Sequence, residues 1–395
     1  MLRKVNFLVN RIFLVKKSNL FYFSIMTLIY IILSTGLADS RDVNFSYLLI
    51  SIPIITVAAI IFLLNSRVAT ISLYGLFLLF FLMAGMVLSL LYSNSVSYAL
   101  YKIYSGIFSA SIAVVLASYL LNHLGERAFI KYFIYVSSMV LLATVVYKIH
   151  FGFLDRSVRF FLNGPIVFGW IMALASLMSL ILFYDSRRYL YLALCIVFIL
   201  ACLWTQSKGP MISLLLVVTL YMLMNFRRNY GFFILVVAIA PLFIYLGSGV
   251  TDFFSRYESL LRLLTQRLSS EDQGSIGVRF EMYSVSWQLF FNNPLFGVGL
   301  GNWHEFSGFD NHLYPHNVLL EILAEGGLFL FLVFFTTFVY IFKNTSEVGR
   351  YILILCLLLT SFSGDLSYLR FLLVFPLAFI WSGSRDPRFA SEDKI

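Results

Sequence analysis

The chain has 395 residues, of which 61% are hydrophobic and only 12% are charged, and its mean hydropathy is +0.90. Soluble domains carry about 25% charged residues, so a soluble enzyme and a disordered chain are both excluded. The formal net charge is +9, but the cations are distributed between apolar runs rather than gathered on one face, which excludes a nucleic-acid-binding protein.

Apolar runs long enough to cross a bilayer, roughly 20 residues each, follow one another along the chain. They predict an all-α, polytopic membrane protein with about 12 transmembrane helices, because the runs are continuously apolar and do not alternate as barrel strands do. The predicted spans are 19–37, 45–64, 69–92, 98–121, 129–149, 165–184, 189–204, 209–225, 230–247, 317–342, 350–366 and 368–382. The last two are short, and a re-entrant pair is the alternative.

The distribution of Lys and Arg predicts the orientation, since short cytoplasmic loops are enriched in cations. With the N-terminus inside, every cytoplasmic connection carries a cation, as at Arg187, Arg188 and Lys343. An even number of spans returns the C-terminus to the cytoplasm. The predicted organisation is a membrane domain over 1–247, one large periplasmic loop over 248–316, and a membrane domain with a cytoplasmic tail over 317–395.

The long loop carries a second pattern, because its apolar residues over 252–268 repeat at helical spacing while its arginines lie off that stripe. This pattern predicts an amphipathic helix. Such a helix lies on the outer membrane surface or packs on other parts of the loop, and the sequence does not decide between the two.

Two cations fall at predicted outer span ends. Lys208 lies in the turn 205–210, where Gly209 and Pro210 favour a tight bend. It is either an anion ligand or an interfacial lysine. Arg279 begins a helical segment, and its planar fork suits a phosphate, although an arginine beside Glu281 is commonly structural.

Glycine and cysteine patterns carry weaker information. Gly297, Gly299 and Gly301 lack the β-α-β context of a dinucleotide site, so they predict a tight turn with close backbone approach. The three cysteines all lie in apolar runs and indicate neither a disulfide framework nor a zinc ribbon.

A histidine precedes the tenth predicted span. His312 and His316 have the spacing of a helical zinc pair, but Pro315 disfavours helix there, and we predict no metal site. A neutral imidazole at His316 can accept a proton from a hydroxyl group. Glu321 and Glu325 follow one and two helical turns later, where they either orient His316 and line a cavity or satisfy neighbouring helix groups.

The segments 294–303, 315–317 and 320–327 resemble the O-antigen ligase and O-antigen polymerase superfamily. Arg279 with Trp287, and the turn 207–210, look like that family's other outer-face motifs. The topology resembles the family over nearly the whole chain, whereas the motif resemblance is concentrated in 205–210 and 279–327.

This resemblance implies a polytopic glycosyltransferase of the GT-C type in the bacterial inner membrane, with its active site facing the periplasm. It implies no cofactor and no metal, and a glycan donor linked to undecaprenyl pyrophosphate. By position, His316 matches a histidine expected to act as base, supported by Asn317, Glu321 and Glu325, and Arg279 matches an arginine expected to hold the pyrophosphate. Further expected pyrophosphate ligands are Lys208, where many relatives have arginine, and Arg159, in a looser motif at 159–165.

Within the superfamily, the turn 207–210 and the composition of the spans favour an O-antigen polymerase that joins one lipid-linked repeat unit to another. The alternative is an O-antigen ligase that transfers the glycan to lipid A core. A polysaccharide flippase or other transporter is less well supported, because the spans carry few midplane charges and the halves show no repeat. Expected partners are the glycan donor, the glycan acceptor and membrane lipids, with a chain-length regulator as a further candidate and no nucleic acid.

Overall fold

The computed structural model describes residues 66–153, 160, 164–225, 270–309 and 312–380. Within those ranges the regular structure is entirely helical, which confirms the all-α prediction. The α-helices are α4 (Ser66–Leu90), α5 (Val96–Ile103), α6 (Ser109–Leu124), α7 (Glu126–Phe151), α8 (Pro165–Ser186), α9 (Tyr189–Trp204), α10 (Lys208–Met224), α13 (Ser270–Asn292), α14 (Trp303–Ser307), α15 (Val318–Asn344), α16 (Glu347–Ser363) and α17 (Leu369–Phe379). A π-helical turn, η1 (Tyr104–Phe108), joins α5 to α6, and a 3₁₀ turn, η2 (Leu366–Tyr368), precedes α17.

The predicted spans that fall on described residues coincide with helices. In the part of the chain that the structure describes, four helices are long and apolar enough to cross a membrane: Val96–Ser118, Glu126–Phe151, Pro165–Ser186 and Val318–Asn344. They support a multi-pass membrane protein. The predicted spans 19–37, 45–64 and 230–247 and the predicted loop helix 252–268 lie outside the described residues.

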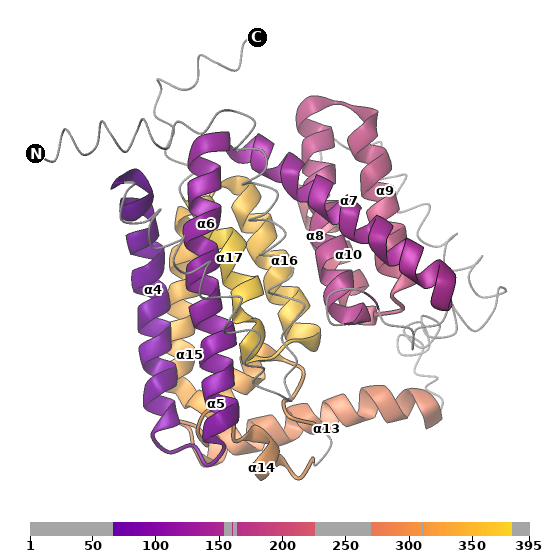
Figure 1. Cartoon of the computed structure of the whole chain (residues 1–395). Coiled ribbons are helices and arrows are strands. Elements are labelled where there is room, and N and C mark those ends of the chain that lie inside the picture. Colours follow the sequence, from indigo (N-terminus) through magenta and orange to yellow (C-terminus); the bar gives the residue numbers. More distant parts are fainter. Residues whose placement is uncertain (1–65, 154–159, 161–163, 226–269, 310–311, 381–395) are drawn as a thin grey trace, which may run out of the picture.

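The helices form a bundle in which α4 lies beside α15, α6 beside α17, and α10 beside α16. Helix α13 lies across one end of this bundle (Figure 1), which we call the α13 end. Met282 of α13, Trp303 of α14 and Ala324 of α15 form a small buried cluster there, and the Trp303 indole donates a hydrogen bond to Ser286 Oγ at 2.8 Å. These contacts fix α13 against the start of α15.

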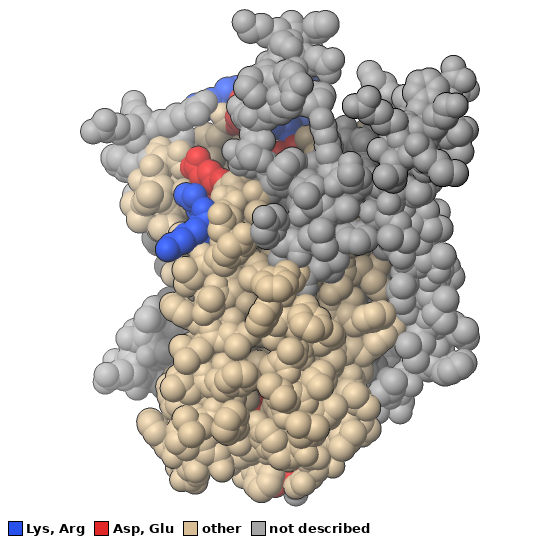
Figure 2. Space-filling model, turned by 90° about the vertical axis from the view of Figure 1, so that its left-hand side faces the viewer, with Lys and Arg blue, Asp and Glu red and all other residues tan. Residues whose placement is uncertain are grey.

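Large apolar side chains point outward from the bundle. Phe77, Phe80 and Phe81 of α4 and Phe335 of α15 are about half exposed. Figure 2 shows the resulting uncharged surface, with Lys and Arg side chains gathered toward one end of it. An exposed apolar surface of this extent is typical of contact with lipid rather than with water.

Helix α15 is interrupted after two and a half turns. Gly327 has φ 62° and ψ −163°, outside the helical region. The segment 294–299 pairs with the opened main chain: Val298 N donates to Ala324 O at 2.8 Å, and Leu328 N donates to Pro294 O at 2.8 Å. Non-helical backbone at membrane depth is tolerated where protein satisfies its polar groups in this way.

We call the contact between segment 294–299 and the interruption in α15 the α15 joint. Its glycines are required by the available space as well as by their backbone conformation. Gly297 has φ 68°, and a Cβ there would lie 2.5 Å from Glu325 C, while a Cβ on Gly327 would lie 2.6 Å from Gly297 N. Only glycine allows two backbones to approach so closely at positive φ. The predicted tight turn with close backbone approach is therefore confirmed.

A second close approach joins the π-turn η1 to the 3₁₀ turn η2. A Cβ on Gly106 would lie 2.5 Å from Leu366 O. Arg370 Nη1 donates to Ser105 Oγ at 2.8 Å and to Ser367 O at 2.8 Å. The extra residue of a π-turn opens the helix locally, and here it makes room for η2.

Candidate functional site

The C-terminal end of α16 is where the predicted site residues meet. Arg279, from the middle of α13, donates a hydrogen bond from Nη1 to Phe362 O at 3.1 Å. Since α13 crosses the end of the bundle (Figure 1), its side chains can reach a helix end that is distant in sequence. A guanidinium group has further N–H donors in a fixed fork, which suits an anion.

His316 lies in the segment that leads into α15, with φ 58°. Its ring packs edge-on against Tyr314 at 4.6 Å and His312 at 5.7 Å between centroids. Its buried Nδ1 has no hydrogen-bond partner among the described residues. A non-glycine residue held at positive φ costs energy and is frequently found at functional sites.

Burial, followed by the charge of Arg279 and the proximity of His312, lowers the pKa of His316 from its ordinary value of 6.5 to about 4. Contact with the Ser363 main chain acts in the opposite direction. The imidazole is therefore neutral at neutral pH and can accept a proton. Because Arg279 contributes, an anion bound beside Arg279 would raise the pKa of His316.

Lys208 is the first residue of α10, and the following residue packs on the same helix end. A Cβ on Gly209 would lie 3.1 Å from both Phe362 Cβ and Ser363 Oγ. The turn before it is ordered by Thr205 Oγ1, which accepts from Ser207 N at 3.2 Å, and by Gln206 at φ 52°. Lys208 thus starts a helix whose N-terminus faces the residues contacted by Arg279 and His316.

Asn317 caps α15. Its Oδ1 accepts hydrogen bonds from Leu319 N at 3.0 Å and Leu320 N at 3.2 Å, as a helix N-cap residue does. The Tyr283 side chain of α13 lies against Asn317 and within the field of Arg279, and burial raises its pKa. Asn317 therefore fixes the helix start that carries His316 and links it to α13.

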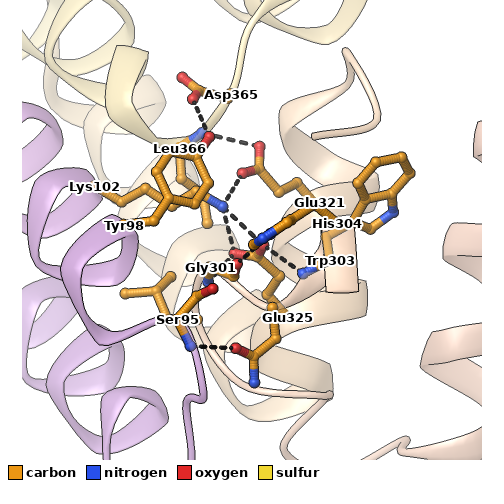
Figure 3. A network of polar contacts seen from close by, with 12 residues as sticks. Ser95, Tyr98, Lys102, Gly301, Trp303, His304, Glu321, Glu325, Asp365 and Leu366 are labelled. Carbon is orange, nitrogen blue, oxygen red and sulfur yellow. Dashed lines mark hydrogen bonds and ion pairs between the residues drawn. The ribbon is translucent and has the colours of Figure 1, made fainter. Parts of the chain in front are cut away.

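Among the described residues, no hydrogen bond joins Glu321 or Glu325 to His316. Both glutamates are fully buried and contact Lys102 of α5 instead. The Lys102 Nζ lies 2.6 Å from Glu321 Oε1 and 2.7 Å from Glu325 Oε1. Figure 3 shows the lysine reaching between the two carboxylates. Of the two predicted alternatives, the structure supports the satisfaction of neighbouring groups.

Main-chain amides complete the shell around these carboxylates. Glu325 accepts from Gly301 N at 2.9 Å and Trp303 N at 3.2 Å, while Glu321 accepts from Leu366 N at 2.9 Å. The cluster of Lys102, Glu321 and Glu325 (Figure 3) is here called the lysine cluster. A buried ion pair is stabilised when its remaining hydrogen-bonding capacity is also used, and these amides reach both oxygens of Glu325 and one oxygen of Glu321.

Beside the lysine cluster, Asp365 accepts a hydrogen bond from the Tyr98 hydroxyl at 3.2 Å, and the Tyr98 ring lies under Lys102 Nζ at 4.5 Å. None of Lys102, Tyr98 and Asp365 was singled out from the sequence. The sequence nevertheless contained a signal for Lys102 and Asp365, because an ionisable residue inside an apolar run is costly and usually has a specific role. Lys102 and Asp365 lie within predicted spans 98–121 and 350–366.

Arg159, predicted as a pyrophosphate ligand, lies outside the described residues. In the part of the chain that the structure describes, no group of three or more His, Cys, Asp or Glu side chains is arranged to hold a metal ion. Cys195, Cys202 and Cys356 are unpaired and buried.

Comparison with known proteins identifies the class. The apolar helical bundle is that of a multi-pass membrane protein. A family model described as O-antigen ligase matches residues 193–335, a range that includes Lys208, Arg279 and His316. The match covers this part of the chain and supports the resemblance to the O-antigen ligase and polymerase superfamily. No curated protein matches the chain.

Proposed function

We propose that this protein is a metal-independent, inverting glycosyltransferase of the GT-C type that polymerises surface polysaccharide from glycans linked to undecaprenyl pyrophosphate. The observation that carries the proposal is the convergence on Phe362 and Ser363 of three segments, which contain Lys208, Arg279 and His316. These segments include a neutral base and two cations, which are the groups that this chemistry needs.

His316 is the proposed general base. A hydroxyl oxygen of the acceptor sugar attacks the anomeric carbon of the donor, and the proton of that hydroxyl passes to the imidazole. The glycosidic bond forms as the bond between the anomeric carbon and the pyrophosphate oxygen breaks. Undecaprenyl pyrophosphate leaves with the electron pair of that bond, and the configuration at the anomeric carbon inverts.

Arg279 and Lys208 are the proposed pyrophosphate ligands. Negative charge grows on the leaving pyrophosphate in the transition state, and preorganised cations stabilise it there more than in the ground state. The N-terminus of α10 adds to this field, because helix N-termini favour anions. Arg159 is a further proposed ligand from the segment 159–165.

The site is proposed to face the periplasm, at the α13 end of the bundle. Polymerase and ligase share the same donor and the same chemistry, and they differ in the acceptor. The turn 207–210 favours polymerase, whereas the description of the matched family model favours ligase as the second candidate. A chain-length regulator is a proposed partner of the polymerase.

A deletion strain complemented with wild type or with His316→Ala tests the proposal. We expect His316→Ala to abolish glycan transfer while the protein remains in the membrane, because the variant lacks the proposed general base. Glycan length on lipid A core is resolved by gel, and membrane content by immunoblot. Core with a single repeat unit indicates a polymerase, and bare core with polymer on the lipid carrier indicates a ligase. An unchanged ladder contradicts both.

A further inference from the structure

The turn between α16 and α17 is more strongly cross-linked than its length suggests. Asp365 accepts from the Tyr98 hydroxyl and from Ser367 Oγ. Ser367 O accepts from Ser105 Oγ at 3.1 Å and from Arg370 Nη1 at 2.8 Å. Helix α5 and the π-turn η1 therefore hold this turn from one side.

The other side of the same turn is held by the lysine cluster. Glu321 accepts the Leu366 amide at 2.9 Å through Oε2 and contacts Lys102 Nζ at 2.6 Å through Oε1. A carboxylate engaged through both oxygens cannot rotate freely, so the Leu366 amide has a fixed position relative to α15. Glu321 lies one helical turn beyond Asn317, on the helix that His316 precedes.

Only Gly364 and Asp365 separate Leu366 from Ser363. Ser363 contacts the His316 ring through its main chain, and Phe362 accepts the hydrogen bond of Arg279. A displacement of Leu366 therefore also moves Ser363 and Phe362, which are the residues that His316 and Arg279 contact. We propose that Glu321, held by Lys102, is a positioning residue that sets the end of α16 against His316 and Arg279.

Glu325 supplies the control, because it also pairs with Lys102, through both oxygens at 2.7 and 2.8 Å, but accepts hydrogen bonds from different amides. Removing either glutamate leaves Lys102 paired with the other. Loss of Glu321 leaves the Leu366 amide without its acceptor, whereas loss of Glu325 affects Gly301, in the loop before α14, and Trp303, the first residue of α14. The two losses are thus similar in charge and differ in which part of the chain is released.

The inference rests on the proposed function and is tested with the full-length protein in lipid nanodiscs. The substrate is undecaprenyl-pyrophosphate-linked glycan extracted from cells that make the polysaccharide. For Glu321→Leu we expect kcat to fall about 10²-fold, the loss that a displacement of about 1 Å can cause, with little change in KM. Glu321→Gln keeps one oxygen acceptor, and its kcat should fall between those of wild type and Glu321→Leu.

Thermal unfolding of the same samples separates positioning from stability. Glu325→Leu leaves two amides without an acceptor and should lower Tm more than Glu321→Leu, while lowering the kcat of the folded protein less. If kcat and Tm instead fall in the same order across the two variants, Glu321 has a structural role only. An unchanged kcat in Glu321→Leu also overturns the inference.

His316→Ala, measured in the same assay, keeps the two proposals distinguishable. If His316→Ala is inactive and Glu321→Leu has wild-type kcat, the positioning role is wrong and the proposed function stands. If His316→Ala has wild-type activity, the proposed function fails whatever Glu321→Leu does.

Discussion

His316 combines a left-handed backbone conformation with a ring that is largely withdrawn from water. Both properties cost free energy, and neither is needed to begin a helix that Asn317 already caps. The three non-glycine residues with positive φ in the described chain are Arg187, Gln206 and His316. Two of them lie in the segments that bring the proposed base and Lys208 together, which places local strain at the site.

The pKa of His316 predicts an unusual pH dependence. In the free protein it lies near 4, so kcat/KM should stay constant as pH falls through 6.5 and should decline only near pH 4. Bound pyrophosphate offsets the charge of Arg279 and raises the pKa, so the decline in kcat should occur at a higher pH than the decline in kcat/KM. Initial rates across this range measure both.

Acid can also unfold the protein. The pKa of His316 is lower in the folded state than in the unfolded chain, so the free energy of unfolding falls as the pH drops below the unfolded pKa. Samples held at each pH and assayed after return to neutrality identify this loss. If kcat/KM instead declines around pH 6.5 and recovers fully on return to neutrality, His316 is not a buried neutral base.

The residues of the lysine cluster illustrate the limit of sequence reasoning at this scale. His316 and Arg279 could be proposed as site residues from the sequence, because their residue types and flanking motifs are informative on their own. The role of Glu321 could not, because it depends on Lys102 and on the Leu366 amide, which lie in other helices. Spacing within one segment does not specify such partners.

Among the elements, α15 and the loop 294–299 depend on each other. The loop supplies donors and acceptors for a helix that is broken at Gly327, and the break creates the space for the loop. The sequence predicted a continuous span at 317–342 and a tight glycine turn as separate features. The helix and the turn were correctly located, but their pairing was not predicted, because the interruption depends on contacts across about 30 residues of chain that pattern analysis does not relate.

This joint predicts a large effect of a single methyl group. Gly297→Ala should destabilise the protein by more than the about 1–3 kcal/mol that positive φ alone costs, because the new Cβ would also meet the Glu325 main chain. The matched control is Gly125→Ala, where φ is 75° and a Cβ would have no neighbour within 4 Å. Thermal unfolding of both variants provides the comparison. Equal losses of Tm would show that the loop can move away from α15.

For the whole molecule, the orientation in the membrane is the property that the proposed function most requires. The α13 end carries the candidate site, while the opposite end carries the Arg127–Asp185 ion pair and the cations at 187 and 188. The positive-inside rule assigns this second end to the cytoplasm. Donor glycans assembled on undecaprenyl pyrophosphate would then meet the site from the periplasm.

Cysteine labelling tests this orientation. Ser284→Cys places an exposed thiol on α13, and Ser186→Cys places one at the opposite end; the three native cysteines are buried and should react little. A membrane-impermeant maleimide added to spheroplasts should label Ser284→Cys only, and disruption of the membrane should expose Ser186→Cys. The reverse pattern would place the site in the cytoplasm and exclude the proposed substrate.

The joint in α15 has a consequence for how a protein of this kind can diversify. It is held by main-chain groups: every residue type provides the carbonyl and every type except proline provides the amide, while Leu295 and Phe296 between the paired positions remain more than half exposed. At this joint, only the glycine positions therefore require a particular residue type. Exposed loop positions can therefore change without loosening the helix that follows the proposed base.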